Sequence, residues 1–138
     1  DKTCDKGRQP IILGVTILTS LNEKDIKQVG IQGPIKSRVL SLAKLAHRAG
    51  LDGVVASPLE VRDIKKKVGK DFIAVTPGIR MPAPDRFNQG TDSKPDDQSR
   101  TMTPGEAVRA GADYIVVGRP IREAKEPVEA VRKILKEI

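Results

Sequence analysis

The chain has 138 residues, of which 25 are Lys or Arg and 18 are Asp or Glu, so its formal net charge is +7. This length suits one hydrophobic core and excludes two ordinary domains, so residues 1–138 are expected to form one domain or part of one. The sequence shows no apolar run of membrane-spanning length and no signal peptide, so we expect a cytoplasmic protein that does not contact a membrane. Single Cys and His residues, Cys4 and His47, argue against an internal disulfide and against a metal site.

The positive charge does not by itself indicate nucleic acid as a partner. Basic residues are interspersed with acidic ones, and the aromatic side chains are limited to Phe72, Phe87 and Tyr114. Proteins that bind single strands use aromatic stacking platforms, which this composition lacks. We therefore expect no nucleic-acid partner, and a basic balance also suits a small phosphorylated ligand.

Apolar segments typical of buried parallel strands alternate with helical patterns along the chain. The expected strands are at residues 11–18, 52–56, 72–76 and 112–117. The expected helices run from Ser20 to Val29, from about residue 35 to Gly50, from Ser57 to Val68, from Thr103 to Gly111, and from Pro127 to Ile138. The last helix is expected to place Val128, Val131, Ile134 and Leu135 on one face.

Several helix ends carry recognisable capping signals. Three pairs have the spacing of a capping box, in which a hydroxyl and a glutamate satisfy each other's backbone N–H groups: Ser20 with Glu23, Ser57 with Glu60, and Thr103 with Glu106. His47 lies near the last turn of its helix, where a histidine interacts favourably with the helix dipole. We therefore expect no catalytic role for His47.

The alternation of strands and helices predicts an α/β fold with a parallel sheet. Four such βα units make half of an eight-stranded barrel. A half-barrel alone leaves two strand edges and an apolar face open to water, so we expect a partner or a second half to cover them.

Two further segments suggest a ligand site. The last strand ends in Gly118-Arg119-Pro120, where glycine permits close approach of a ligand, arginine suits phosphate oxygens and proline can begin a short helix. An ordinary strand-to-helix turn with a solvated arginine is the alternative. Residues 79–102 lack apolar periodicity, and so long a segment in a compact domain is typical of a lid, a binding loop or disorder.

Five motifs follow one another over nearly the whole chain. They are Val15-Thr16-Ile17-Leu18-Thr19-Ser20, Gly50-Leu51-Asp52-Gly53-Val54-Val55, Val75-Thr76-Pro77-Gly78-Ile79-Arg80, Asp97-Gln98-Ser99-Arg100 and Gly118-Arg119-Pro120. With them the chain resembles the C-terminal half of the orotidine 5′-phosphate decarboxylase family. The resemblance implies a TIM (β/α)₈ barrel in which residues 1–138 supply strands five to eight.

The resemblance also implies a function and a set of substrate contacts. The family converts orotidine 5′-monophosphate to UMP and CO₂ in pyrimidine biosynthesis, as a homodimer, without a metal or an organic cofactor. Residues matching the family's substrate contacts are Thr19 and Ser20 beside the pyrimidine, Pro77 as a wall of the base pocket, and Arg80, Gln98, Gly118 and Arg119 at the phosphate. Simpler interpretations are open as well: Ser20 can be a helix cap, and Gln98 and Arg119 can be solvated side chains.

One departure from the family limits what this chain can do. The family's chemistry uses an Asp-x-Lys-x-x-Asp motif on an earlier strand, and the nearest strings identified here are Asp25-Ile26-Lys27 and Asp63-Ile64-Lys65. Neither has the second aspartate, and both fall in expected helices, so we interpret them as solvated faces. No catalytic residue is assigned, and the isolated chain is expected to be inactive.

Two other functions remain open from the sequence. The first is another phosphate-binding barrel of the same group, such as a sugar-phosphate decarboxylase or synthase. The second is a half-barrel that binds phosphorylated ligands without catalysis.

Overall fold

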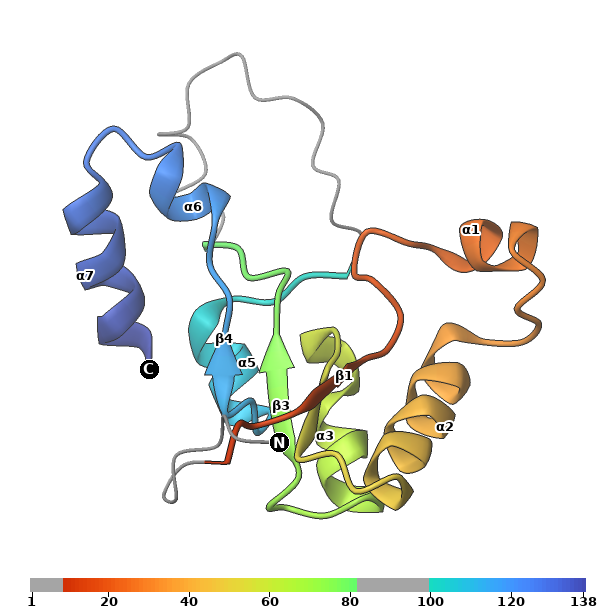
Figure 1. Ribbon diagram of the computed structural model, residues 1–138. Coiled ribbons are helices and arrows are strands. Elements are labelled where there is room, and N and C mark those ends of the chain that lie inside the picture. The colour runs from red at the N-terminus through yellow and green to blue at the C-terminus, as the bar shows by residue number, and fades with distance from the viewer. Residues whose placement is uncertain (1–8, 82–99) are drawn as a thin grey trace, which may run out of the picture.

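A four-stranded parallel sheet forms the centre of the protein (Figure 1), described in a computed structural model for residues 9–81 and 100–138. The strands are β1 (Leu13–Val15), β2 (Gly53–Val55), β3 (Ile73–Thr76) and β4 (Tyr114–Ile115), and they lie in the order β1-β2-β3-β4. Each strand pairs with the next one in sequence, as in a run of βα units. The predicted α/β fold with a parallel sheet is therefore confirmed.

Helices separate the strands in the predicted order. They are α1 (Glu23–Gln28), α2 (Ile35–Arg48), α3 (Pro58–Lys67), α5 (Pro104–Arg109), α6 (Arg119–Arg122) and α7 (Pro127–Glu137). In the view of Figure 1, α1 and α2 lie to the right of the strands and α6 and α7 to the left. None of the helices in the described ranges is long and apolar enough to cross a membrane.

The strands are shorter than the sequence predicts. The first was expected at residues 11–18 but extends only over Leu13–Val15, and the last covers only Tyr114–Ile115. Ladder-like hydrogen bonds continue just beyond the strands, with Thr16 N donating to Val55 O at 3.1 Å and Ala56 N to Val75 O at 3.1 Å. Apolar composition thus predicts where a strand lies more reliably than where its regular pairing stops.

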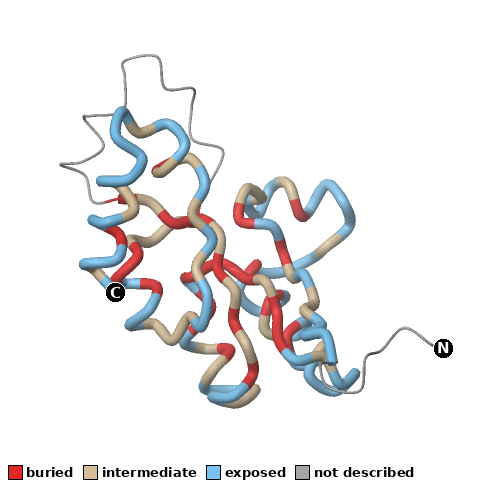
Figure 2. The backbone as a smooth tube through the Cα atoms, turned by 60° about the vertical axis from the view of Figure 1, so that its left-hand side comes forward, coloured by how far each residue is buried: buried red, intermediate tan, exposed pale blue. Residues whose placement is uncertain are grey.

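The hydrophobic core lies between the sheet and the helices that cover it. Its buried members are Ile17, Ile26, Ile35, Val39, Ala43, Val54, Ala56, Ile64 and Phe72. Figure 2 shows the buried stretches toward the middle of the molecule and the exposed ones toward its outside. His47, in the last turn of α2 as predicted, packs edge-on against the Phe72 ring with centroids 5.3 Å apart.

One of the three predicted capping boxes is confirmed and two are wrong. Thr103 and Glu106 form theirs at the start of α5. At α1 the cap is Asn22, whose side chain accepts hydrogen bonds from Lys24 N and Asp25 N, while the Asp25 carboxylate accepts one from Asn22 N. The helix therefore begins two residues later than a cap at Ser20 would require. At α3, Ser57 is the cap, but Glu60 turns away into the protein.

A polar cluster fastens the amino ends of β3 and β4. Lys65 Nζ donates to the carbonyl oxygens of Lys70 and Phe72 and to Asp113 Oδ2, and Asp113 Oδ2 also accepts from Ala74 N at 2.7 Å. The prediction that Lys65 belongs to a solvated face is therefore wrong. Asp25, Lys27 and Asp63 do lie on helices as predicted, on α1 and α3.

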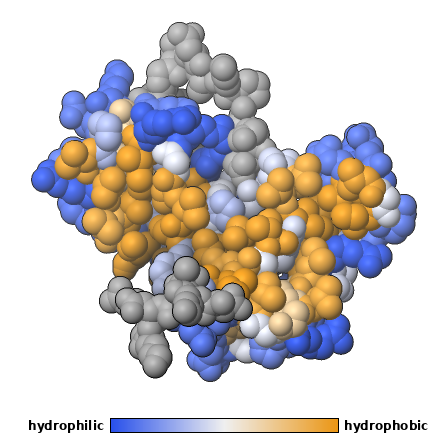
Figure 3. Space-filling model, in the orientation of Figure 1, coloured by the Kyte–Doolittle hydropathy of each residue, from blue (hydrophilic) through white to orange (hydrophobic). Residues whose placement is uncertain are grey.

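A broad apolar surface is exposed on the face shown in Figure 3. Large apolar side chains stand exposed along both outer strands and on the helices: Ile11, Ile12, Val15 and Leu18 around β1, Tyr114 and Val116 around β4, Leu42 and Leu45 on α2, and Val128 and Leu135 on α7. The predicted apolar face of α7 is correct in position, but only Ile134 of its four residues is buried. These open edges are what half of a closed barrel presents.

Gly53 provides a test of the sheet packing. A Cβ at this position would lie 2.3 Å from Ile73 O of the neighbouring strand, whereas a Cβ at Gly14 would meet only side chains, at 3.0 Å and beyond. We predict that Gly53→Ala lowers the free energy of unfolding by about 1–3 kcal/mol and that Gly14→Ala lowers it less. Urea unfolding of both variants measures this, and equal losses would contradict the close β2–β3 approach.

Candidate functional site

A small cavity opens at the carboxyl end of the sheet. It measures about 190 Å³ and is lined by Val15, Ile17, Leu18, Thr19, Ser20, Val55, Ala56 and Pro77. Parallel strands direct the segments that follow them to the same edge, which is where α/β proteins bind ligands. The structure therefore brings together Thr19, Ser20 and Pro77, three residues predicted from the sequence to contact substrate.

The cavity combines an apolar wall with two hydroxyl groups. Thr19 is buried and Ser20 is half-buried, and both lie in the segment that follows β1, which ends at Val15. Because Asn22 rather than Ser20 caps α1, the Ser20 hydroxyl is not committed to the helix end. Hydroxyls of this kind can donate and accept hydrogen bonds at the edge of a polar ring.

The other predicted contacts follow the two neighbouring strands. Arg80 comes just after β3, and its Nη1 donates to Ile79 O at 2.9 Å. Gly118 and Arg119 come just after β4, where α6 begins at Arg119. Both arginines are half-buried, and a Cβ built on Gly118 would meet open space. These three residues do not line the small cavity but lie at the ends of adjacent strands, while Gln98 falls outside the described residues.

The long segment between β3 and α5 begins and ends at one place. Ile79 and Met102 form a parallel bridge, with Arg80 N donating to Met102 O at 2.9 Å and Met102 N to Gly78 O at 3.3 Å. Residues 82–99 lie outside the described part of the chain. The two ends of the segment are therefore held together beside the carboxyl end of β3.

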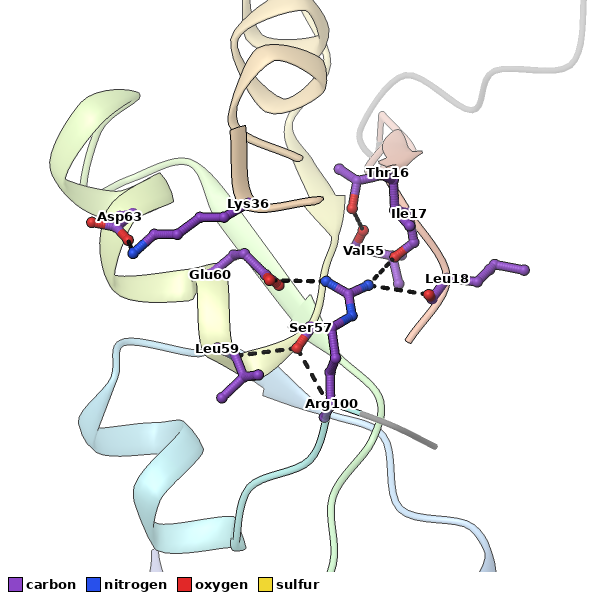
Figure 4. Close-up of polar contacts among 10 residues, drawn as sticks. All are labelled: Thr16, Ile17, Leu18, Lys36, Val55, Ser57, Leu59, Glu60, Asp63 and Arg100. Carbon is purple, nitrogen blue, oxygen red and sulfur yellow. Dashed lines mark hydrogen bonds and ion pairs between the residues drawn. The ribbon is translucent and has the colours of Figure 1, made fainter. Parts of the chain in front are cut away.

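Arg100 is a central residue of this region that the sequence analysis did not assign a role. Its Nη1 donates to Glu60 Oε1 at 2.8 Å, and its Nη2 donates to Ile17 O at 3.0 Å and Leu18 O at 3.1 Å (Figure 4). The Ser57 hydroxyl, the cap of α3, donates to the backbone oxygen of Arg100 at 3.4 Å. Arg100 thus joins the start of α3 to the backbone that leads into Thr19 and Ser20.

This ion pair is removed from water. The side chains of Arg100 and Glu60 are 10% and 5% exposed. Burial raises the pKa of Glu60, and the nearby Arg100 guanidinium opposes that rise. A guanidinium can satisfy a carboxylate and two carbonyls at once because its donors lie in one rigid plane.

Sequence reasoning missed this pair for a definite reason. Glu60 lies three residues after a serine, which is the spacing of a capping box, so a local explanation was at hand. Its actual partner is 40 residues away in sequence. A single sequence carries no signal of that pairing.

The described residues offer no metal site, since no three of their His, Cys, Asp or Glu side chains gather closely enough to hold an ion. One string that the sequence analysis overlooked, Asp92-Ser93-Lys94-Pro95-Asp96-Asp97, does match the spacing of the Asp-x-Lys-x-x-Asp motif. It lies outside the described residues, in a polar stretch without the apolar run of a strand. We assign it no catalytic role.

Comparison with known proteins identifies the family. The family model described as Orotidine 5'-phosphate decarboxylase / HUMPS family matches residues 2–134. The chain belongs to this family. Curated orotidine 5'-phosphate decarboxylases agree: one from Geobacter sp. (strain M21) is 52% identical over 94% of this chain, and one from Geotalea uraniireducens (strain Rf4) is 53% identical over all of it.

Solved structures of the decarboxylase family give the same fold. The orotidine 5'-phosphate decarboxylase from Lactobacillus acidophilus aligns with a TM-score of 0.72 at 38% identity, covering 96% of this chain and 51% of that one. The chain likewise spans 50% and 54% of the length of the two curated relatives. The four βα units are therefore those of half a TIM (β/α)₈ barrel.

The buried pair gives the site a stability test. Glu60→Ala leaves the Arg100 guanidinium without its counter-ion, so we predict that it lowers the free energy of unfolding by about 3–5 kcal/mol. Asp63→Asn, which breaks the more exposed ion pair between Lys36 of α2 and Asp63 of α3, is the control and should change it far less. Urea unfolding measures both, and similar small losses would show that Glu60 and Arg100 are not paired in solution.

Proposed function

We propose that this chain is the phosphate- and pyrimidine-binding portion of an orotidine 5′-phosphate decarboxylase, which converts orotidine 5′-monophosphate to UMP and CO₂ in pyrimidine biosynthesis. The observation that carries the proposal is the meeting of Thr19, Ser20 and Pro77 around one cavity at the carboxyl end of the sheet. Family membership supports the choice of substrate. No metal or organic cofactor is part of the proposal.

Each strand end contributes a different kind of contact. Thr19 and Ser20, after β1, face the pyrimidine with their hydroxyl groups, and Pro77, after β3, forms an apolar wall for the ring. Arg80 and Arg119, with Gly118 and Gln98, hold the phosphate. A guanidinium on a strand end suits this role because its planar donors match phosphate oxygens and the strand fixes its base.

The chemistry at the reacting carbon falls to the other half of the barrel. In the family that the chain resembles, an array of aspartates and lysines disfavours the substrate carboxylate relative to the carbanion left after CO₂ departs, and a lysine protonates that carbon. We assign this array to the other half. Binding energy from the distant phosphate is used to stabilise this transition state. The residues of this chain bind and orient the substrate.

The exposed apolar face supports a second element of the proposal. The other barrel half, on the same or another chain, pairs with the edges of β1 and β4 and covers residues such as Val15, Leu18 and Val116. This chain then supplies strands five to eight of a domain that works as a homodimer in the cytoplasm. Pairing across both edges closes the barrel.

Activity measurements test the proposal directly. We predict that a protein containing both barrel halves decarboxylates orotidine 5′-monophosphate, whereas the purified 138-residue chain shows no turnover above background, because the proton donor lies in the other half. Decarboxylation by the isolated chain would contradict the proposal, because the catalytic array would then have to lie in this chain. Lys94 would be the first residue to test by substitution. If the complete protein turned over a sugar phosphate but not orotidine 5′-monophosphate, the alternative function in the same family would be favoured.

The phosphate contacts allow a second test in the complete protein. Arg119→Ala removes a charge-assisted contact and should cost about 2–4 kcal/mol in kcat/KM, while Gln98→Ala removes a neutral one and should cost about 1–2 kcal/mol. Neither change should matter for a substrate that lacks its phosphate. The measurement is kcat/KM for both substrates. Equal losses on the two would show that these side chains support the fold rather than grip the phosphate.

A further inference from the structure

We infer that Arg100 is a positioning residue of the active site, which holds the backbone leading into Thr19 and Ser20 so that their hydroxyl groups meet the substrate base. The inference rests on the proposed function. It assigns to Arg100 a role through the β1 segment rather than a contact with substrate.

The geometry restricts the β1 segment at two adjacent points. Arg100 Nη2 donates to the carbonyl oxygens of Ile17 and Leu18, the two residues immediately before Thr19. β1 itself ends at Val15, so the last sheet contact of this stretch is Thr16, whose N and Oγ1 both donate to Val55 O. Beyond Thr16, no strand of the described structure pairs with this segment. The two hydrogen bonds from Arg100 hold it instead.

Arg100 is in turn fixed from the opposite side. Glu60, in the first turn of α3, binds Nη1, and the cap of that helix, Ser57, binds the Arg100 backbone oxygen. Figure 4 shows the guanidinium lying between Glu60 and the two carbonyls. The position of Thr19 and Ser20 is therefore tied to α3, a ten-residue helix packed in the core.

The chemistry of the pair favours positioning over simple stabilisation. Glu60 Oε2 and Arg100 Nε are buried without a hydrogen-bond partner among the described residues. A buried ion pair with unsatisfied atoms recovers little of its desolvation cost, so an apolar pair would serve stability as well. An apolar pair could not donate hydrogen bonds to two successive carbonyl groups, as Arg100 does. The amino end of the sheet, by contrast, is fastened by Lys65 and Asp113, far from the strand ends that carry the site.

The test is a double-mutant cycle in the complete protein. Arg100→Lys keeps the charge beside Glu60 but replaces the planar fork by a single ammonium, which cannot bind the carboxylate and both carbonyls in the same geometry. We expect it to lower kcat/KM for orotidine 5′-monophosphate by roughly 10-fold or more. The same substitution is then made in a background that already lacks both hydroxyls, Thr19→Val with Ser20→Ala.

If Arg100 acts through these hydroxyls, its substitution should cost at most about 3-fold in the background without them. A loss of the same size in both backgrounds, or no loss in the wild-type background, overturns the inference. The control is Asp63→Asn, which breaks the ion pair between α3 and Lys36 of α2, away from the site, and should change kcat/KM little in either background. Glu60→Gln, which keeps an acceptor for Nη1, provides a second cycle if Arg100→Lys does not fold.

A substrate comparison separates this inference from the proposed function. Arg100→Lys should reduce kcat/KM by the same factor for the substrate with and without its phosphate, because its effect is at the base. Loss confined to the phosphorylated substrate would place Arg100 with the phosphate contacts and contradict the inference while leaving the decarboxylase function intact. Failure of the unmodified complete protein to decarboxylate orotidine 5′-monophosphate would contradict the proposed function itself.

Discussion

The parallel pairing of β1 to β4 is the constraint on which the rest of the structure depends. Because all four strands run in the same direction, the segments that follow them emerge at one edge, although they are separated by tens of residues in sequence. Ser20 and Pro77 line one cavity for this reason, and Arg80 and Arg119 follow neighbouring strands. The same arrangement leaves two outer strands, around which large apolar side chains are exposed.

The two ends of the sheet are built differently. At the amino end, Lys65 and Asp113 satisfy backbone groups of β3 and its surroundings and fix the strands in place. At the carboxyl end, Arg100 and Glu60 form a buried pair that holds the backbone before Thr19, and one atom of each has no hydrogen-bond partner among the described residues. In TIM barrels generally, the carboxyl-terminal face of the sheet carries the active site and the opposite face contributes to stability.

The sequence predicted the fold better than the site. Strand order, helix order and the Thr103–Glu106 cap follow from local patterns, and local patterns survive in the structure. Ser20 and Glu60 were assigned to caps because their spacing fits, but Asn22 is better placed for α1, and Glu60 has a partner 40 residues away. Contacts of that kind depend on tertiary packing, which the pattern of a single sequence does not contain.

The most direct test of the account is a crystal structure of the complete protein with UMP bound. The account predicts that another strand pairs with the free edge of β1, that the Ser20 hydroxyl lies within hydrogen-bond distance of the pyrimidine, and that Arg119 contacts the phosphate. It also predicts that Arg100 remains bound to Glu60 and to the carbonyl groups of Ile17 and Leu18. UMP bound elsewhere, with the cavity beside Thr19 and Pro77 empty, would contradict it.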